Sequence, residues 1–248
     1  MGREAKNLTI TGHLGELRQR LIICLMTLVI TTISSFLFVD KLRAIITRPA
    51  GDIQLIFLTP PEALMADLRL SVMFGLALAM PVLVYHLLAF LLPAFESYEK
   101  KIIIPAVLAV FVFFVLGVLF AYFVVFPFSV RFFLNFATDT LQPLFTISNY
   151  LSFAVNFIFA FGIVFQLPLL FLTLGQLNMV EAKLLRRYRK YALLAVLVIA
   201  AVLTPPDVFS QLMLGIPLYG LYELGILLVA FSQRGRKVAD KSECFHFH

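Results

Sequence analysis

Long uninterrupted apolar runs constrain this chain more than any other feature of its sequence. A helix needs about 20 apolar residues to cross roughly 30 Å of hydrocarbon, and runs near that length recur along the chain. Hydrophobic residues make up 61% of the 248 and charged residues 14%, whereas a soluble domain is about 45–50% apolar and roughly 25% charged. The sequence therefore predicts an all-α integral membrane protein.

Six membrane spans are predicted, at about 21–39, 68–92, 102–126, 150–174, 191–203 and 208–231. Prolines lie inside the second and fourth spans, and Pro127 is expected to close the third. The fifth run covers only about 20 Å at 1.5 Å per residue, which is less than the membrane core. Since a turn of a few residues at 204–207 joins it to the sixth, we expect both helices five and six to be short.

The connecting segments complete the predicted organisation. A short amphipathic helix is expected from Asp40 to Arg48, with Pro49 as its stop, followed by a polar loop to about Asp67. A single transmembrane domain is expected over residues 1–232, and residues 233–248 are expected to form a loose polar tail.

The distribution of basic residues predicts the orientation of the chain. Six spans place both termini on one side, and 15 of the 20 Lys and Arg residues fall on that side. Because cytoplasmic loops are enriched in Lys and Arg, both termini are predicted to be cytoplasmic. The net charge of +6 is attributed to these loops, and no nucleic-acid partner is expected.

Four polar residues stand out within the apolar spans, namely Asn156, Gln166, Gln211 and Glu223. Gln166 lies two residues before Pro168, so it either satisfies a carbonyl that the proline frees or faces a water-accessible concave surface. Glu223 either sits at mid-span, at a cost of about 2.5–3.5 kcal/mol, or lies close to the cytoplasmic boundary. Both pairs of alternatives remain open from the sequence.

Signatures of catalysis and of cofactor binding are missing. The sequence has no Gly-rich phosphate loop and no HExxH, and its four histidines lack metal-ligand spacing. Paired catalytic residues in facing spans are also missing, so neither an enzyme nor a cofactor is expected. A proton-coupled secondary transporter of a small solute is the alternative function, although only Glu223 could serve as its mid-membrane acid.

Five spaced motifs carry a resemblance to a known family. They are 13–18 (HLGELR), 59–62 (TPPE), 93–101 (PAFESYEKK), 161–168 (FGIVFQLP) and 204–211 (TPPDVFSQ). In this order, and in register with six spans, they resemble TatC, the signal-receptor subunit of the twin-arginine protein translocase. The resemblance covers nearly the whole chain, from about residue 8 to residue 232.

The resemblance implies a glove-like six-helix bundle with a concave face, in the bacterial cytoplasmic membrane. It also implies a receptor for folded proteins whose signal peptides carry two consecutive arginines, with transport driven by the protonmotive force. The implied partners are TatA, TatB where it is present, membrane lipids and further copies of the chain in a receptor complex.

The resemblance also implies roles for individual residues. Glu16 and Glu99 would bind the arginine pair, with Arg18 and Phe90 nearby. Carboxylates suit this task because each can accept a two-pronged guanidinium fork, although the same residues could be ordinary solvated loop charges. Gln166, at a position that holds Glu or Gln in the family, would lie in the concave face. On the periplasmic side, the family's functional positions correspond to Pro49 and Asp207.

Overall fold

The computed structural model describes the backbone of residues 10–51, 55–91, 99–134, 145–176, 179–203 and 208–244. Side chains are described over residues 15–49, 51, 55–90, 104–134, 145–176, 179–201, 208 and 211–233. The chain divides into two compact units. Unit 1 comprises Met1–Ile45 and Phe57–Phe111, and unit 2 comprises Ile46–Ile56 and Val112–His248.

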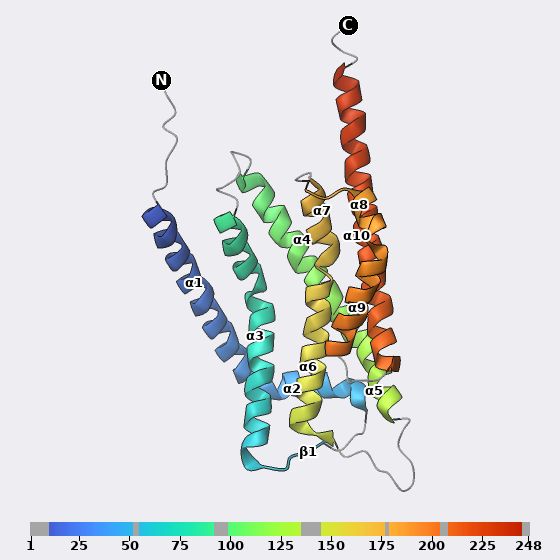
Figure 1. The fold of residues 1–248 in the computed structure, drawn as a ribbon. Helices are drawn as coiled ribbons and strands as arrows, with labels where there is room; N and C mark the ends of the chain where they lie inside the picture. The colour runs from blue at the N-terminus through green and yellow to red at the C-terminus, as the bar shows by residue number, and fades with distance from the viewer. Residues whose placement is uncertain are drawn as a thin grey trace. The chain divides into compact units, whose positions relative to one another are not determined.

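Unit 1 is built on two long antiparallel helices, α1 (Ile10–Leu37) and α3 (Pro60–Leu91), with the start of α4 (Glu99–Phe120) beside them (Figure 1). Ser71, Gly75 and Ala79 are buried at four-residue intervals on one stripe of α3. A Cβ at Gly75 would lie only 2.5–2.7 Å from atoms of Thr32 on α1. Small residues thus let the two backbones approach closely, as membrane helices commonly do.

The segment between α1 and α3 contains the predicted amphipathic helix. It is α2 (Val39–Thr47), which agrees with the prediction to within one residue at each end. A 3₁₀ turn, η1 (Arg48–Ala50), holds Pro49 directly after it. Gly51 follows at φ 70°, a conformation that glycine adopts without steric cost.

The prediction of a loop extending to about Asp67 is wrong from Pro60 onward, because α3 already begins there. Two prolines at a helix start have the φ that the first turn requires and need no hydrogen-bond donor there. The N–H of Glu62 donates to the carbonyl of Thr59 (3.0 Å), and its Oε2 accepts from the N–H of Leu58 (2.8 Å). The helix signal was therefore present in the sequence as Thr-Pro-Pro-Glu.

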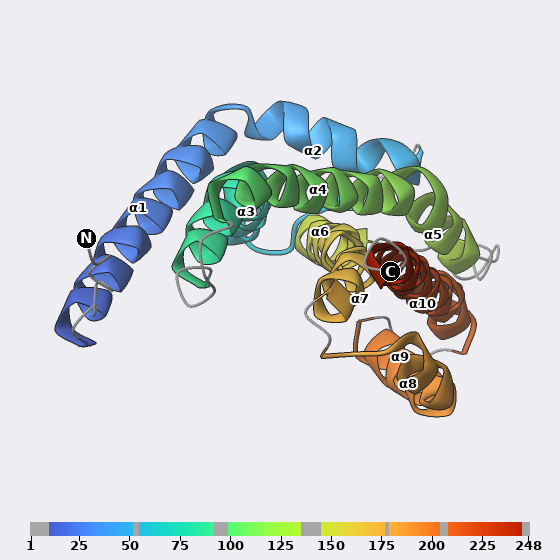
Figure 2. The ribbon, with the colours of Figure 1, turned by 90° about the horizontal axis from the view of Figure 1, so that it is seen from above.

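Unit 2 holds the remaining elements. They are the second half of α4, η3 (Ala121–Val125), α5 (Phe126–Leu134), α6 (Ile147–Val164), α7 (Leu167–Gln176), α8 (Ala182–Arg187), α9 (Arg189–Leu203) and α10 (Val208–Cys244). A two-residue parallel pair joins β1 (Leu55–Ile56) to β2 (Phe145–Thr146). Helix α10 packs against α7 and α9 (Figure 2). Phe126, Phe157 and Phe161 are buried in contact with neighbouring rings and form an aromatic core.

The third span does not end at Pro127, as the sequence predicts. The helix passes through one turn of π-helix, η3, and continues as α5 to Leu134. A proline inside a regular α-helix clashes with the carbonyl four residues earlier. We attribute the continuation to the wider π turn, which relieves that clash immediately before the proline.

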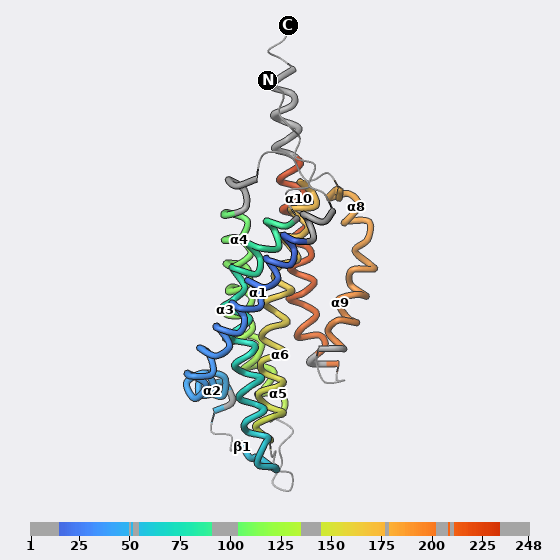
Figure 3. Tube along the Cα trace, turned by 90° about the vertical axis from the view of Figure 1, so that its left-hand side faces the viewer, coloured from blue at the N-terminus to red at the C-terminus, as the bar shows by residue number. Residues whose placement is uncertain are grey.

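The fourth span is confirmed as one membrane-length stretch, Ile147–Gln176, broken into α6 and α7 just before Pro168. Five stretches of the described chain are long and apolar enough to cross a membrane. Helix α9, with 15 residues, is shorter than these, as predicted, and runs alongside α10 (Figure 3).

Helix α10 is longer than expected. Its apolar stretch Gln211–Gln233 alone has 23 residues. The helix continues to Cys244, so the tail predicted to be loose over residues 233–248 is helical as far as Cys244. The residues after Ser232 include Lys, Arg, Ala and Glu, which are good helix formers despite their polarity. An all-α membrane fold is confirmed, whereas the glove-like concave shape stays a prediction.

Candidate functional site

Three of the predicted site residues belong to helix ends that lie at the same end of unit 1. Glu16 lies in the second turn of α1, Phe90 is the penultimate residue of α3, and Glu99 is the first residue of α4. The start of α1, the end of α3 and the start of α4 share that end of the unit (Figure 1). The side chain of Glu99, together with Glu96, lies outside the described residues, and Phe90 is half-buried.

The Glu16 carboxylate is held by a cation of its own helix. Arg20 donates from Nε to Oε1 of Glu16 at 3.0 Å, and a second bond runs from Nη2 to the same oxygen. Within the described residues Oε2 accepts no hydrogen bond. The Glu16 side chain keeps 32% of its surface exposed, so this second oxygen remains available to a ligand.

Arg18 does not join this pair. Its side chain is exposed and makes no hydrogen bond or ion pair within the described part of the chain. Residues two positions apart on a helix point to different sides, so Arg18 cannot share the face of Glu16 and Arg20. It contributes a solvated positive charge near the start of α1.

The other predicted site residues belong to unit 2. Pro49 is half-buried in η1, while Asp207 lies outside the described residues. Gln166 occupies the turn between α6 and α7, where its own N–H donates to Ile163 (2.9 Å) instead of Gly162. Its side-chain Nε2 donates to the Gly162 carbonyl at 3.3 Å. The side chain thus replaces a backbone bond that the break removes, which favours the kink-repair interpretation.

The negative charge of Glu223 is paired with a cation from the basic segment 183–190, which connects the fourth and fifth spans. Arg189, at the start of α9, donates from Nη2 to Oε2 of Glu223 at 2.6 Å, and Tyr219 donates to Oε1 at 3.2 Å. Nearby, the hydroxyl of Tyr222 donates to the carbonyl of Leu185 at 2.7 Å. Because Arg189 belongs to the basic segment, these contacts favour a position for Glu223 near the membrane boundary.

The two remaining intramembrane amides differ. Gln211 donates from Nε2 to the carbonyl of Leu197 at 2.9 Å and so ties α10 to α9. Asn156 is exposed on α6 and has no partner among the residues with described side chains. Polar groups in a span usually meet a partner helix, and of these two amides Gln211 follows that rule among the described residues.

A bidentate ion pair between Arg43 on α2 and Asp67 on α3 was not predicted from the sequence. Arg43 donates from Nε to Oδ1 of Asp67 at 2.9 Å, and its Nη2 bonds to Oδ2. Hydrogen bonding to Asp67 raises the pKa of Arg43 above its usual value. The partners lie 24 residues apart, so no local pattern could have revealed the pair.

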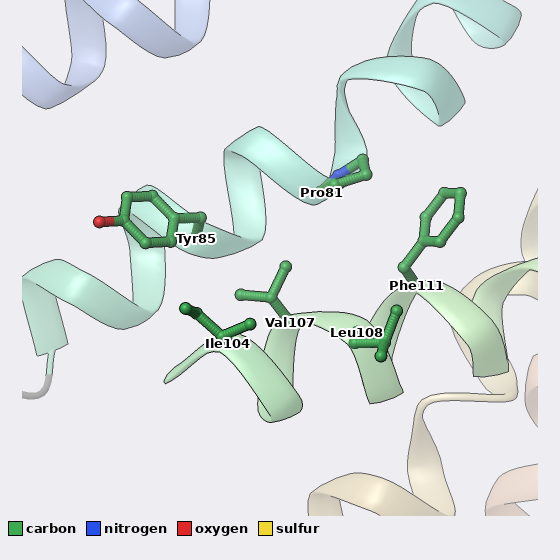
Figure 4. Close-up of a pocket in the computed structure, with 6 residues that line it drawn as sticks. All are labelled: Pro81, Tyr85, Ile104, Val107, Leu108 and Phe111. Carbon is green, nitrogen blue, oxygen red and sulfur yellow. The ribbon is translucent and has the colours of Figure 1, made fainter. Parts of the chain in front are cut away.

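An open apolar pocket of about 230 Å³ lies between α3 and α4. Figure 4 shows its lining, which consists of Pro81, Tyr85, Ile104, Val107, Leu108 and Phe111. All six residues belong to unit 1 and to stretches of membrane length. The mostly apolar lining suits hydrocarbon chains or aliphatic side chains. No cluster of His, Cys, Asp and Glu that could hold a metal ion occurs among the described residues.

Comparison with known proteins identifies the family. A family model described as Sec-independent protein translocase protein (TatC) matches residues 12–217. The chain belongs to the TatC family. A TatC protein of Carboxydothermus hydrogenoformans is 38% identical over 231 residues, which cover 92% of this chain and 95% of the relative. The TatC protein of Escherichia coli K12 is 33% identical over 231 residues, covering 88% and 87%.

Solved TatC structures share the fold. A crystal structure named as the twin arginine translocase receptor TatC superimposes with a TM-score of 0.78 at 35% identity, covering 89% of this chain and 99% of that one. A second, in the detergent DDM, gives 0.79 over 87% and 98%. This chain is therefore a multi-pass membrane subunit of a protein translocase, as TatC membership implies.

Proposed function

We propose that this chain is the receptor and core subunit of a twin-arginine translocase. It binds signal peptides that carry two consecutive arginines and transports folded proteins with the protonmotive force. The observation that carries the proposal is the part-exposed Glu16 carboxylate, one of whose oxygens accepts no hydrogen bond from the residues with described side chains. It lies at the end of unit 1 where α3 ends and α4 begins with Glu99. A TatC relative of known structure bears the name receptor.

The chemistry of the arginine pair supports two carboxylate contacts. Guanidinium groups bind carboxylates through charge-assisted hydrogen bonds that define their geometry, whereas lysine acts as a point charge. A single exposed ion pair contributes only about 0–1 kcal/mol. Useful affinity therefore needs Glu16 and Glu99 together, with Arg18 and Phe90 nearby, and burial of the apolar stretch of the signal.

The proposed surroundings follow the family. The apolar stretch of the signal packs in a concave face near Gln166, and Pro49 and Asp207 act on the periplasmic side. Both termini lie in the cytoplasm, and the chain resides in the bacterial cytoplasmic membrane. It works with TatA and, where present, TatB, and further copies of the chain join it in a receptor complex.

Site-specific photocrosslinking tests the receptor role. A twin-arginine signal peptide and its twin-lysine counterpart are crosslinked to the full chain in membranes, with the wild type, Glu16→Gln and Glu99→Gln. Glu181→Gln is the matched control, because Glu181 is exposed and its side chain makes no hydrogen bond or ion pair within the described residues. We expect crosslinks that require both arginines, fade in either test variant and persist in the control.

Unchanged crosslinking would overturn the receptor role, if it is seen both with the twin-lysine peptide and with the Glu16→Gln and Glu99→Gln variants. It would favour the alternative, a proton-coupled transporter of a small solute. That alternative lacks support from Glu223, since Arg189 and Tyr219 occupy both of its oxygens. Solute uptake by the purified chain in liposomes distinguishes the two, because a translocase subunit alone is expected to show none.

A further inference from the structure

The contact between Arg20 and Glu16 has a consequence for ligand binding. Two nitrogens of Arg20, Nε and Nη2, both donate to Oε1 of Glu16. A two-pronged guanidinium fork from a ligand needs both carboxylate oxygens. Among the described residues, therefore, only Oε2 is left without a donor for such a ligand to use before Arg20 moves.

The ion pair between Arg20 and Glu16 is favourable without a ligand, yet it can separate at little cost. Glutamate four residues before a basic residue is the favourable order on a helix, so Arg20 holds Glu16 whenever no ligand is bound. The two side chains retain 22% and 32% of their surface, so water can solvate both groups when they separate. Arg20 can therefore leave without exposing a buried, uncompensated charge.

We propose that Arg20 is an internal competitor that determines how arginine ligands gain access to Glu16. A signal arginine forms its full fork only by displacing the Arg20 guanidinium from Oε1. The exchange replaces one guanidinium with another, so a lone cation gains little. A ligand with a second arginine and an apolar stretch gains enough elsewhere to drive the exchange. This inference rests on the proposed function, since it assumes that Glu16 binds a signal arginine.

Two possible roles of Arg20 predict opposite effects of Arg20→Gln. Either Arg20 competes with the ligand for Glu16, or it holds the Glu16 side chain in place for the ligand. If Arg20 competes, removing it frees both Glu16 oxygens and removes a like charge, so the twin-arginine peptide binds more tightly. The expected gain is about threefold at low salt and shrinks as salt screens the charges. The twin-lysine peptide should gain less, because lysine cannot use both oxygens as a fork. Damage to the fold would lower affinity instead.

The experiment measures the dissociation constants of labelled twin-arginine and twin-lysine peptides for the full chain in nanodiscs. The variants are Arg20→Gln, Arg20→Lys, Glu16→Gln and the Arg20→Gln/Glu16→Gln double variant. Arg131→Gln is the charge-matched control, because Arg131 is exposed on α5 and makes no hydrogen bond or ion pair within the described residues. The double variant isolates the effect that Arg20 exerts through Glu16.

We expect tighter binding in Arg20→Gln, a smaller gain in Arg20→Lys, none in Arg131→Gln, and loss of the gain in the double variant. Weaker or unchanged binding in Arg20→Gln, while Glu16→Gln still weakens binding, overturns the competitor role and leaves the receptor proposal standing. A gain that survives in the double variant also overturns it, because the effect would then be general electrostatics. Glu16→Gln without any effect overturns the proposed role of Glu16 itself.

Discussion

The guanidinium of Arg189 on α9 donates to the carboxylate of Glu223 on α10 at 2.6 Å, across 34 residues of sequence. The pair joins the basic connector to the one acidic residue in the apolar stretch Gln211–Gln233. It also leaves Glu223 with a hydrogen bond on each oxygen, since Tyr219 occupies Oε1. A carboxylate that is costly in an apolar helix is thereby tolerated.

The two partners of this pair should differ in their effect on stability. We expect Arg189→Gln to destabilise the protein by about 1 kcal/mol, because it leaves a part-buried carboxylate without its cation. Glu223→Gln should cost less, since Arg189 is 47% exposed and can be solvated, and the amide oxygen still accepts from Tyr219. Thermal unfolding in detergent, followed by circular dichroism, measures both. An equal or larger loss in Glu223→Gln would contradict this account.

The fork between Arg43 and Asp67 should stabilise the junction of α2 and α3. The Asp67 side chain is only 13% exposed, and hydrogen bonds between charged groups contribute about 1.5–3 kcal/mol. Asp67→Asn should lose most of this, because its NH₂ group would face the guanidinium donors. The matched control is Asp40→Asn, which alters a carboxylate that contacts the same guanidinium at 3.3 Å but is 88% exposed. If the unfolding midpoints fall equally in Asp67→Asn and Asp40→Asn, the greater importance of Asp67 would be refuted.

Because α1 and α3 approach closely at Gly75, adding one methyl group there should lower the stability of the protein substantially. In Gly75→Ala the new Cβ would lie 2.7 Å from backbone atoms of Thr32, which cannot rotate away, so overpacking should cost about 1–3 kcal/mol. Gly220→Ala on α10 is the control, since nothing lies within 4 Å of its Cβ. That variant should instead gain about 0.5–1 kcal/mol from helix propensity. Thr32→Ala should not rescue Gly75→Ala, because the backbone contact remains.

Local signals explain which parts of the fold were predictable. Hydrophobic runs gave the spans, and the amphipathic pattern with Pro49 gave α2, because both depend on residues close in sequence. The start of α3 was predicted too late because Pro60 was assigned to a loop, and the end of the third span was predicted too early because Pro127 was interpreted as a stop. In the structure Pro60 starts a helix, and a π turn accommodates Pro127.

The site was predictable in part for the same reason. Antiparallel helices place the start of α1 and the end of α3 at the same end of unit 1, so Glu16 and Phe90 could be assigned to that end. The pairing of Glu16 with Arg20 was readable from their four-residue spacing but was overlooked. By contrast, Arg43–Asp67 and Arg189–Glu223 join residues 24 and 34 positions apart, and only the tertiary structure reveals them.

Gln166 allows a final test that separates its two interpretations. Its Nε2 bond to the Gly162 carbonyl should contribute about 0.5–1.5 kcal/mol, so Gln166→Ala should lower the unfolding temperature. Gln166→Glu should do the same at neutral pH, because an ionised carboxylate has no proton to donate. Asn156→Ala is the matched control in α6, since that amide is exposed and has no partner among the described residues.

Crosslinking of the signal peptide to the Gln166 variants completes the test. If the side chain only repairs the break between α6 and α7, peptide crosslinking and thermal stability should fall together, and conditions that restore stability should restore crosslinking. If Gln166 faces the bound peptide, crosslinking should fall in Gln166→Ala while the unfolding temperature stays at the wild-type value. The local hydrogen bonds favour the first outcome, and the second would assign Gln166 to the binding surface directly.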